Sequence, residues 1–483
     1  MSAEPAPPPL LAGLPAQTRL AFTARGAVSA ARFAADVRQV AERIEATMPG
    51  CRHVLNICSD RYRFIVGFAA ALLADRISLL PSSQTGETVR QMRDFAPDLF
   101  CIEDGGESTI LIPPDLPALN LATLGLGTDT ADGKEEAEPL LPAMPAEQIA
   151  AYVFTSGSTG MPIPHRKTWG RLVRNAAAAI EQLELASSPT TRTAIVATVP
   201  PQHMYGFESS VLLNLLGHCP IWSGRPFYPA DIVAALAAVP RPRMLVTTPF
   251  HLRTLLDAGV EIPPVDRILS ATAPLPATLA EQAEAALGAP VHEIYGCTET
   301  GQIATRRITQ SPLWSLMRDI QLRADDDGVI ASGGHIEGEI RLGDIIEQHP
   351  EGRFLLLGRH TDLINIAGKR TTLGYLNQQL LAIAGVEDGC FYMPDDSKTD
   401  QSAQITRLCA IVAAPGLSRS TLLAALRQRI DAIFLPRPLI LVERLPRNST
   451  GKLPRTALTA IVAEHAAQAH ASAAMPGAAP AEP

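Results

Sequence analysis

The sequence predicts an α/β protein with a large N-terminal domain of doubly wound sheets and a small, mobile α+β C-terminal domain. Its 483 residues exceed the size at which one core keeps growing, and 46% of them are hydrophobic, which is enough for more than one core. From residue 53 onward, short apolar runs alternate with segments of helical periodicity, the pattern of a doubly wound sheet. From Thr361 the order changes to strand, helix, strand, strand, helix, strand, which indicates a separate α+β unit.

The N-terminal segments lead into the large domain, which we place at residues 16–358. Residues 1–15 are rich in Pro and Ala and are predicted to form a flexible tail. Ser29 is suited to cap a helix whose apolar stripe runs from Phe33 to Ile44. The elements predicted next are a strand at 53–57, a helix at 62–74, and strands at 77–80, 193–199, 244–248 and 267–270.

A hydroxyl-rich loop, here called the glycine loop, follows a predicted buried strand at 149–154 and precedes a helix that carries Leu172 and Leu183. Its residues are Thr155, Ser156, Gly157, Ser158, Thr159 and Gly160. Glycines let the backbone approach a ligand closely, and hydroxyl and N–H groups donate to phosphate oxygens. The mononucleotide P-loop needs Lys directly after its second glycine, but Met161 follows Gly160, which argues against a kinase or GTPase.

A second motif, Tyr295-Gly296-Cys297-Thr298-Glu299, combines an aromatic ring, a tight turn, a hydroxyl and a carboxylate. This combination suits stacking of a base while a cation is held against phosphate. Taken alone, each motif is also what an ordinary surface loop or polar strand end contains. Together they predict a nucleotide site.

Composition excludes several classes of function. A net charge of −8 and a pI near 5.8 argue against nucleic acid as a partner, since neutralising phosphates needs clustered Lys and Arg. The seven cysteines are scattered without a CxxC pair, which favours a reduced, cytoplasmic location over a disulfide framework or zinc knuckle. The longest apolar stretch, at 64–74, is shorter than the ~20 residues of a membrane span.

The segment from Tyr152 to Pro162 reads Tyr-x-x-Thr-Ser-Gly-Ser-Thr-Gly-x-Pro and resembles the phosphate loop of the adenylate-forming superfamily. This superfamily includes acyl- and aryl-CoA synthetases, luciferases and the adenylation domains of peptide synthetases. The Tyr-Gly-x-Thr-Glu motif and later pieces at 337–344, 353–362 and 445–455 match the superfamily in the same order. The resemblance covers roughly residues 16–465, and within the superfamily it is nearest to compact acyl- or aryl-acid ligases of aryl-polyene pigment pathways.

The resemblance implies ATP and Mg²⁺ as cofactors. In such enzymes Tyr295 would stack on adenine, Thr298 would contact the α-phosphate region, and Glu299 with Thr155 would bind Mg²⁺. The remaining nucleotide-binding residues that it implies, besides the glycine loop, are Thr272, Ala273, Pro274, Gly296 and the ribose contacts Asp344 and Arg359. The substrate pocket would be lined by His203, Met204 and Phe207.

The C-terminal part is implied to act as a mobile lid over this site. The domain boundaries are a hinge at 359–361, which contains Thr361, a lid domain at 362–466 and a flexible Ala/Pro-rich tail at 467–483. Within the lid we predict strands at 390–393, 408–412 and 439–442, and a helix that carries Leu422, Leu423, Leu426, Ile430 and Ile433. By resemblance Lys452 is the catalytic lysine that contacts the carboxylate oxygen and the α-phosphate, and Lys369 and Arg370 face the incoming thiol.

The implied reaction is adenylation of a carboxylic acid by ATP followed by thioester formation. A hydroxybenzoate-type aryl acid and an acyl carrier protein are the predicted substrates, and an aryl or medium-chain acyl-CoA ligase is the alternative. A non-catalytic nucleotide-binding scaffold is a further alternative, because Ile163, Thr272 and Thr361 depart from the superfamily pattern. Ile163 stands where Lys is usual, and we hypothesise that Lys167 supplies the missing charge.

Overall fold

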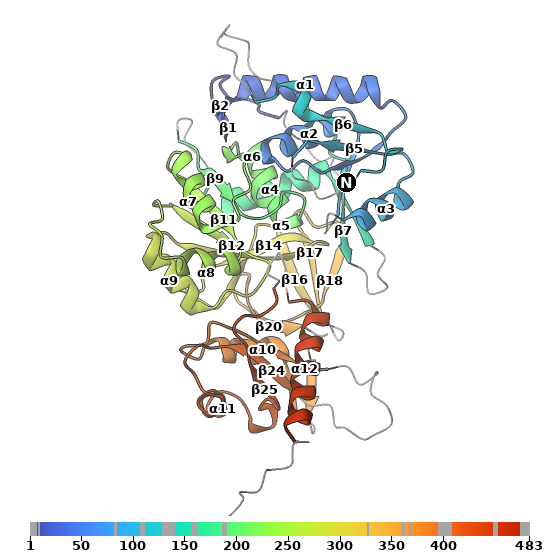
Figure 1. The fold of residues 1–483 in the computed structure, drawn as a ribbon. Coiled ribbons are helices and arrows are strands. Elements are labelled where there is room, and N and C mark those ends of the chain that lie inside the picture. Colours follow the sequence, from blue (N-terminus) through green and yellow to red (C-terminus); the bar gives the residue numbers. More distant parts are fainter. Residues whose placement is uncertain are drawn as a thin grey trace, which may run out of the picture.

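The computed structural model describes residues 7, 10–81, 85–106, 112–127, 141–156, 162–185, 191–325, 328–359, 363–366, 369–394, 408–447 and 453–473. These residues form a large domain and, at one end of it, a smaller C-terminal domain (Figure 1). The predicted α/β fold with a separate small domain is thereby confirmed.

An eleven-stranded sheet runs through the large domain in the order β19-β20-β15-β14-β13-β12-β11-β9-β10-β1-β2. Its strands are β1 (Arg19–Thr23), β2 (Gly26–Ser29), β9 (Ala194–Ala197), β10 (Ile221–Trp222), β11 (Arg243–Thr247), β12 (Arg267–Ser270), β13 (Val291–Cys297), β14 (Gly301–Arg306), β15 (Trp314–Leu316), β19 (Asp344–His349) and β20 (Arg353–Arg359). Neighbouring strands from β13 to β1 are parallel. Their carboxyl ends therefore share one edge, where the segments after β9, β12 and β13 come together.

A six-stranded sheet of order β6-β5-β3-β4-β7-β8 lies beside it. Its strands are β3 (His53–Asn56), β4 (Ile77–Leu80), β5 (Leu99–Glu103), β6 (Ala118–Asn120), β7 (Ile149–Ser156) and β8 (Pro162–Thr168). Strands β3 to β7 are parallel to their neighbours, whereas β8 is an antiparallel edge strand. Helix α3 (Gly86–Phe95) packs on this sheet through Val89 and Met92.

Two helices, α2 (Arg61–Leu73) and α4 (Trp169–Gln182), lie between the two sheets. Helix α2 contacts β3 and β4 on one side and β10 on the other, and α4 contacts β8 and β14. A helix in this position must be apolar on most of its surface, and nearly every residue of α2 is buried. Helix α1 (Ala30–Thr47) packs on α2 and is capped as predicted, since the Ser29 hydroxyl accepts from the Arg32 N–H at 3.2 Å.

The opposite face of the large sheet is covered by α7 (Pro229–Ala238), α8 (Pro249–Asp257) and α9 (Ala277–Leu287) (Figure 1). Successive residues of β9 point to opposite faces, so Ile195 joins the core toward α2 and Val196 joins the core under these three helices. Between β9 and β10 the chain forms short helical segments, namely α5 (Met204–Gly206), the π-helix η2 (Phe207–Leu212) and α6 (Leu213–Leu215). A 3₁₀ turn, η1 (Leu121–Leu124), follows β6.

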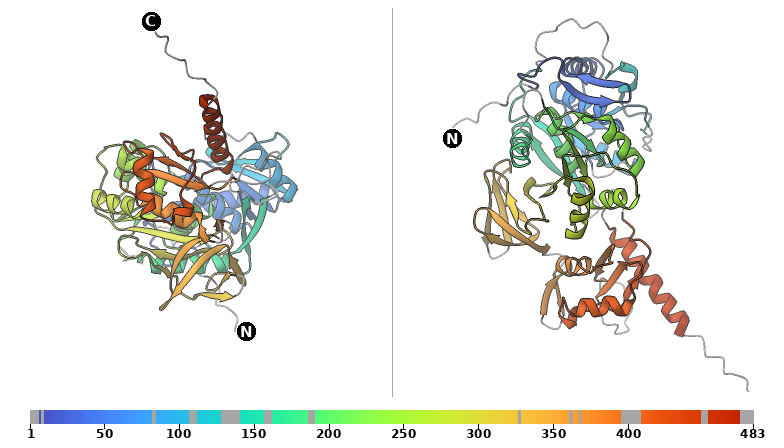
Figure 2. Two further views of the ribbon diagram at one scale, coloured as in Figure 1. Left: turned by 90° about the horizontal axis from the view of Figure 1, so that it is seen from below. Right: turned by 90° about the vertical axis from the view of Figure 1, so that its left-hand side faces the viewer.

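A three-stranded antiparallel sheet of β16 (Ile320–Asp325), β17 (Gly328–Gly333) and β18 (Glu339–Leu342) stands out to one side of the large domain (Figure 2). In the small domain β21 (Leu363–Ile366) pairs with β22 (Lys369–Thr372). A three-stranded sheet has the order β23 (Asp388–Tyr392), β24 (Cys409–Ala413), β25 (Leu439–Leu441). Its helical segments are α10 (Leu373–Leu381), α11 (Arg419–Arg427), η5 (Ala432–Phe434) and α12 (Arg455–Ala473). Among the ranges that the structure describes, no helix is both long and apolar enough to cross a membrane.

Three predicted boundaries need correction. Leu10, Leu11 and Leu14 are at most 2% exposed and belong to the main core, so residues 10–14 are not part of a flexible tail. Helix α11 ends at Arg427, and Ile430 and Ile433 lie beyond it, because the Asp431 side chain caps a new 3₁₀ turn. Helix α12 continues to Ala473, so the predicted C-terminal tail does not begin at residue 467.

Candidate active site

The glycine loop connects two antiparallel strands, β7 and β8, where the sequence had predicted a strand, the loop and then a helix. Strand β8 pairs with β7 so that Ile163 lies opposite Thr155. The strand was missed because its sequence, with Pro162 and Pro164, is polar and lacks a run of apolar residues. An edge strand tolerates prolines, since one side of its backbone needs no partner. Residues 157–161 of the loop, and the side chain of Ser156, lie outside the described part of the structure.

Thr155 and Glu299, the two residues expected to bind Mg²⁺, converge on one imidazole. Thr155 Oγ1 is 2.9 Å from His165 Nε2, and Glu299 Oε1 is 3.6 Å from the same nitrogen. Desolvation lowers the pKa of His165 against the opposing effect of the Glu299 charge. Desolvation raises the pKa of Glu299, but hydrogen bonds and the charges of His165 and Lys167 outweigh it and the net shift is downward.

These two oxygens suit a magnesium ion. A hydroxyl and an ionised carboxylate are hard oxygen donors, and Mg²⁺ usually takes one or two protein ligands while phosphate and water complete its shell. Within the described ranges there is no cluster of three or more His, Cys, Asp or Glu that would hold a metal without such help. Thr155 and Glu299 thus fit a cation that arrives with a nucleotide.

Tyr295 and Asp344, expected at the adenine and the ribose, are in direct contact. The Tyr295 hydroxyl donates to Asp344 Oδ2 at 2.8 Å. The Tyr295 ring is supported by Trp314 and Phe354, each with its ring centroid 5.5 Å away. Asp344 lies opposite Arg359 in the pairing of β19 with β20, which puts both predicted ribose residues at one end of that hairpin. The side chain of Arg359 lies outside the described residues.

The turn after β12 has a left-handed residue where the superfamily usually carries Gly. Thr272 has φ +77°. A side chain costs roughly 1–2 kcal/mol in this region, so the substitution leaves strain in the turn. Ala273, which is partly exposed, and Pro274, which is exposed, follow beside the exposed Gly296 turn at the same sheet edge.

The predicted acid-pocket residues divide into two groups. His203 and Met204 are partly exposed, at the start of α5. Phe207 is fully buried, and its ring packs edge-on against Phe68 at 4.9 Å between centroids. The structure therefore places Phe207 in the core between the sheets instead of on an open pocket wall, because η2 turns its ring toward α2.

The lid residues are placed only in part. Lys369 lies exposed on β22 and forms an ion pair with Asp431. Thr361 and Lys452 lie outside the described residues, as does the side chain of Arg370. The segment that leads to Lys452 is anchored by Arg447, whose Nε and Nη2 each donate to the Asp388 carboxylate at 2.7 Å.

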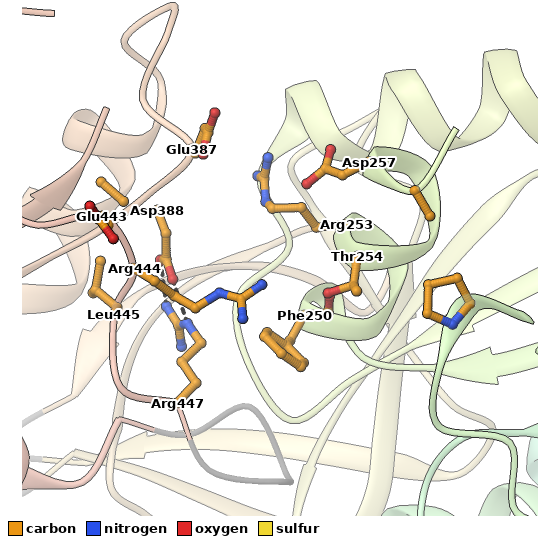
Figure 3. Close-up of a pocket in the computed structure, with 13 residues that line it drawn as sticks. Phe250, Arg253, Thr254, Asp257, Glu387, Asp388, Glu443, Arg444, Leu445 and Arg447 are labelled. Carbon is orange, nitrogen blue, oxygen red and sulfur yellow. Dashed lines mark hydrogen bonds and ion pairs between the residues drawn. The ribbon is translucent and has the colours of Figure 1, made fainter. Parts of the chain in front are cut away.

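A cavity of about 300 Å³ lies between α8 of the large domain and the end of β25 in the small domain. Figure 3 shows Arg253 and Arg444 extending into this gap from the two domains, with the Asp388–Arg447 ion pair at its side. Among the residues that the structure describes, none of the predicted nucleotide or acid-pocket residues lines it. The cavity thus marks the junction between the domains and is separate from the predicted acid pocket.

Sequence reasoning missed a buried polar cluster beneath Glu299. Lys167 is 8% exposed, and its ammonium donates to the Glu299 carbonyl at 3.0 Å. Around it lie Asn175, Glu208, Gln302 and His335, which are all buried. The alternation of β8 puts Ile163, His165 and Lys167 on one face, and a correct strand assignment would have revealed this. For Glu208 and His335 the sequence carries no local signal.

Comparisons with known proteins show the family and the fold. The model of the family described as "AMP-binding enzyme" matches residues 13–327. A 4-coumarate–CoA ligase of Rhodobacter capsulatus is 30% identical over 287 residues, covering 59% of this chain and 69% of that protein. An L-proline–[L-prolyl-carrier protein] ligase of Streptomyces coelicolor is 22% identical over 510 residues, covering 90% and 92%. The O-succinylbenzoate coenzyme A synthetase of Bacillus subtilis, solved with ATP and a magnesium ion, shares the fold with a TM-score of 0.73 at 19% identity, covering 91% of this chain and 96% of that one.

Proposed function

Because this chain belongs to the family of AMP-binding enzymes, we propose that it joins an aryl carboxylic acid, such as a hydroxybenzoate, to an acyl carrier protein. As an AMP-forming acid–thiol ligase it activates the acid with ATP. The substrate carboxylate attacks the α-phosphorus, the bond to the β-phosphate oxygen breaks, and pyrophosphate leaves. The thiol then attacks the carbonyl carbon of the acyl adenylate, its proton is lost, and AMP departs.

The contact between Tyr295 and Asp344 is the observation that carries this proposal. The Tyr295 hydroxyl donates to Asp344 at 2.8 Å, so the proposed adenine stacker and ribose acceptor form one surface. Glu299 follows Tyr295 in the same turn and lies near Thr155 at the start of the glycine loop. A nucleotide held by these groups has its base at Tyr295 and its phosphates toward the glycine loop.

Each group has a task that fits its chemistry. A bound Mg²⁺ would be held by Thr155 and Glu299 and would neutralise phosphate charge. Lys452 supplies a fixed cation to the pentacoordinate phosphorus, where such electrostatic stabilisation is expected to dominate. The acyl adenylate reacts readily with water, so closure of the small domain protects it until the thiol arrives.

The charge of the small domain favours an acidic thiol acceptor, without separating a carrier protein from CoA. Residues 360–470 contain 12 Lys and Arg against 9 Asp and Glu, whereas the whole chain has a net charge of −8. A locally basic domain attracts an acidic partner, and both a carrier protein and the phosphates of CoA are acidic. CoA is the alternative acceptor, because the 4-coumarate relative is named as a CoA ligase.

Pyrophosphate release tests the proposal. The full chain is mixed with ATP, Mg²⁺ and a panel of aryl and fatty acids, and the reaction is then repeated with CoA or with a phosphopantetheinylated carrier protein. We expect release with hydroxybenzoates and thioester on the carrier. Thioester on CoA alone would make the chain a CoA ligase, and no release with any acid would favour the non-catalytic scaffold. The reaction needs soluble substrates, and we propose that it takes place in the cytoplasm.

Two variants test the roles of individual groups. Lys452→Ala should slow adenylation by roughly 10²–10³-fold, the usual effect of removing one group that stabilises transition-state charge. Glu299→Gln should raise the Mg²⁺ concentration needed for half-maximal rate. Full adenylation rates in Lys452→Ala would contradict the assignment of the catalytic lysine.

A further inference from the structure

Lys167 differs from an ordinary phosphate-binding lysine because it is buried under a loop of protein. Its position is 8% exposed, and its ammonium donates to the Glu299 backbone carbonyl at 3.0 Å. Desolvation lowers its pKa, and the carboxylates of Glu208 and Glu299 act in the opposite direction. Ile163, four residues earlier on the same strand, is 50% exposed. The ammonium-bearing residue of this strand is therefore much more deeply buried than residue 163, where the superfamily usually carries Lys.

Glu208 is a buried carboxyl group in the same cluster, and burial raises its pKa to about 7. Its Oε1 accepts from Asn175 Nδ2 at 2.8 Å and from the Gln302 N–H at 3.2 Å. Gln302 Nε2 in turn donates to Asn175 Oδ1 at 2.9 Å. The carboxylate from η2 is thus bound to α4 and to the first residues of β14, directly after the Glu299 turn.

The backbone after Glu299 packs closely against the side chains of Asn175 and Glu208 at Gly301. Gly301 has φ +74°, and a Cβ at that position would lie 2.6 Å from both Asn175 Nδ2 and Glu208 Oε1. Within the turn, the Cys297 N–H donates to Thr300 Oγ1 at 3.3 Å, and Thr300 Oγ1 donates to the Gly301 carbonyl at 2.8 Å. The backbone from Cys297 to Gly301 is therefore held by hydrogen bonds within the turn and, from below, by the contacts of Lys167 with the Glu299 carbonyl and of Glu208 with the Gln302 N–H.

We propose that Lys167 is a positioning residue that fixes the Glu299 turn through its hydrogen bond to the Glu299 carbonyl, so that the Glu299 carboxylate faces the cation that accompanies ATP. Lys167 then acts on cation binding through the Glu299 backbone and makes no contact with phosphate. This inference rests on the proposed role of Glu299 and replaces the hypothesis that Lys167 takes over the phosphate contact missing at Ile163.

Measurements of cation binding distinguish a positioning role of Lys167 from a direct contact with phosphate. We would measure the affinity for Mn²⁺ by electron paramagnetic resonance with α,β-methylene-ATP bound, and the affinity for ATP in EDTA by calorimetry. Lys167→Met should weaken Mn²⁺ binding roughly 10-fold or more, as is usual when the support of a metal ligand is removed, and change metal-free ATP affinity less than about 2-fold. The double variant Lys167→Met/Glu299→Gln should bind Mn²⁺ no more weakly than Glu299→Gln alone.

Two further variants serve as controls. Arg166→Met removes an exposed cation on the opposite face of the same strand, paired with Glu337, and should leave Mn²⁺ binding unchanged. Lys167→Met/Glu208→Gln removes both buried charges, which should preserve folding while the Mn²⁺ defect remains.

Three results would overturn the positioning role: unchanged Mn²⁺ affinity in Lys167→Met, an equal loss of metal-free ATP affinity, or additive effects with Glu299→Gln. Measurements on the wild-type protein distinguish failure of the positioning role from failure of the proposed function. If wild-type protein bound α,β-methylene-ATP without any dependence on Mn²⁺, the proposed role of Glu299 would fall instead.

Discussion

The two domains hold their polar side chains in different ways. Among the described residues, every polar or charged side chain that is buried belongs to the large domain except Thr372. Thr372 itself lies at the junction, where its hydroxyl donates to the Leu357 carbonyl of β20 at 2.8 Å. The interior of the small domain is formed by two apolar clusters, and Lys369 stands on its surface.

This difference suggests a separate role for each domain in the proposed reaction. Buried polar groups have fixed geometry because each lost hydrogen bond inside a protein is costly. We therefore propose that the large domain sets the positions of the predicted nucleotide-binding groups before a ligand arrives. An apolar core with polar groups outside it suits the proposed role of the small domain as a lid that moves as a unit. The predictions that follow test this contrast through stability, in order of decreasing effect.

Replacing Arg61 should have the largest effect. This side chain is 1% exposed, and its guanidinium donates to Ser210 Oγ at 2.6 Å and to the Ala197 and Val199 carbonyls at 3.0 and 2.6 Å. Burial lowers its pKa to about 9, so its charge is poorly solvated. Arg61→Met should lower the free energy of unfolding by about 3 kcal/mol, because the two carbonyls and the hydroxyl lose their donors.

Urea unfolding followed by tryptophan fluorescence measures this effect in the large domain, since Trp169, Trp222 and Trp314 all belong to it. The control is Arg63→Met on the same helix, which removes one hydrogen bond, at 3.2 Å to the Asp104 carbonyl. A loss of stability no greater than that of the control would show that the buried guanidinium is not a structural anchor.

His335 should make stability depend on pH. Burial lowers its pKa from 6.5 to about 4, with the charges of Lys167, Arg174 and Arg171 acting in the same direction. Between these values the unfolded chain binds a proton that the folded protein does not, so the contribution of His335 is lost as pH falls from 6.5 toward 4. Between pH 7.5 and 5 the loss should be about 2 kcal/mol.

The variant His335→Asn should lack this loss, and it is compared with wild type by urea unfolding at both pH values. His349→Asn, which removes a partly exposed imidazole paired with Glu347 at 3.0 Å, is the matched control. Equal pH dependence in wild type and His335→Asn would mean that the buried imidazole is protonated in the folded protein.

The sequence predicted most of the large domain because its strands and helices carry regular apolar patterns. The stripe of α1 and the apolar runs of β3, β9 and β11 are all buried at the expected positions. Strand β8 was missed because an edge strand with two prolines has no such pattern. The end of α11 was misplaced because a side-chain cap at Asp431, which apolar spacing does not reveal, starts a new turn.

For the site, the sequence could predict which residues have suitable chemistry, but contacts between distant segments escaped it. Tyr295 and Asp344 were assigned to neighbouring parts of one nucleotide, and their hydrogen bond is consistent with that assignment. The position of His165 between Thr155 and Glu299 depends on three segments meeting. Phe207 was misassigned because its identity fits a pocket wall as well as a core, and only the direction of η2 decides between them.

Unlike Arg61→Met, Thr272→Gly should raise the free energy of unfolding. Thr272 has φ +77° and is exposed, so glycine removes backbone strain without leaving a cavity. The gain should be about 1 kcal/mol after the extra flexibility of glycine in the unfolded chain is counted. Urea unfolding measures it, and Thr272→Ala, which retains a Cβ, is the control. Destabilisation by glycine would show that the Thr272 side chain contributes more than its backbone strain costs.

Lys369→Ala should have the smallest effect on stability. Its side chain is 57% exposed, and its ion pair with Asp431 is a surface pair, which is typically worth about 0–1 kcal/mol because water screens both charges. We expect a change below about 0.5 kcal/mol in urea unfolding followed by circular dichroism, with Asp431→Asn as the matched partner variant. If Lys369 faces the incoming thiol, the same substitution should slow thioester formation while pyrophosphate release is kept. A large loss of stability would mean that the small domain, too, depends on fixed polar contacts, and the contrast between the two domains would fail.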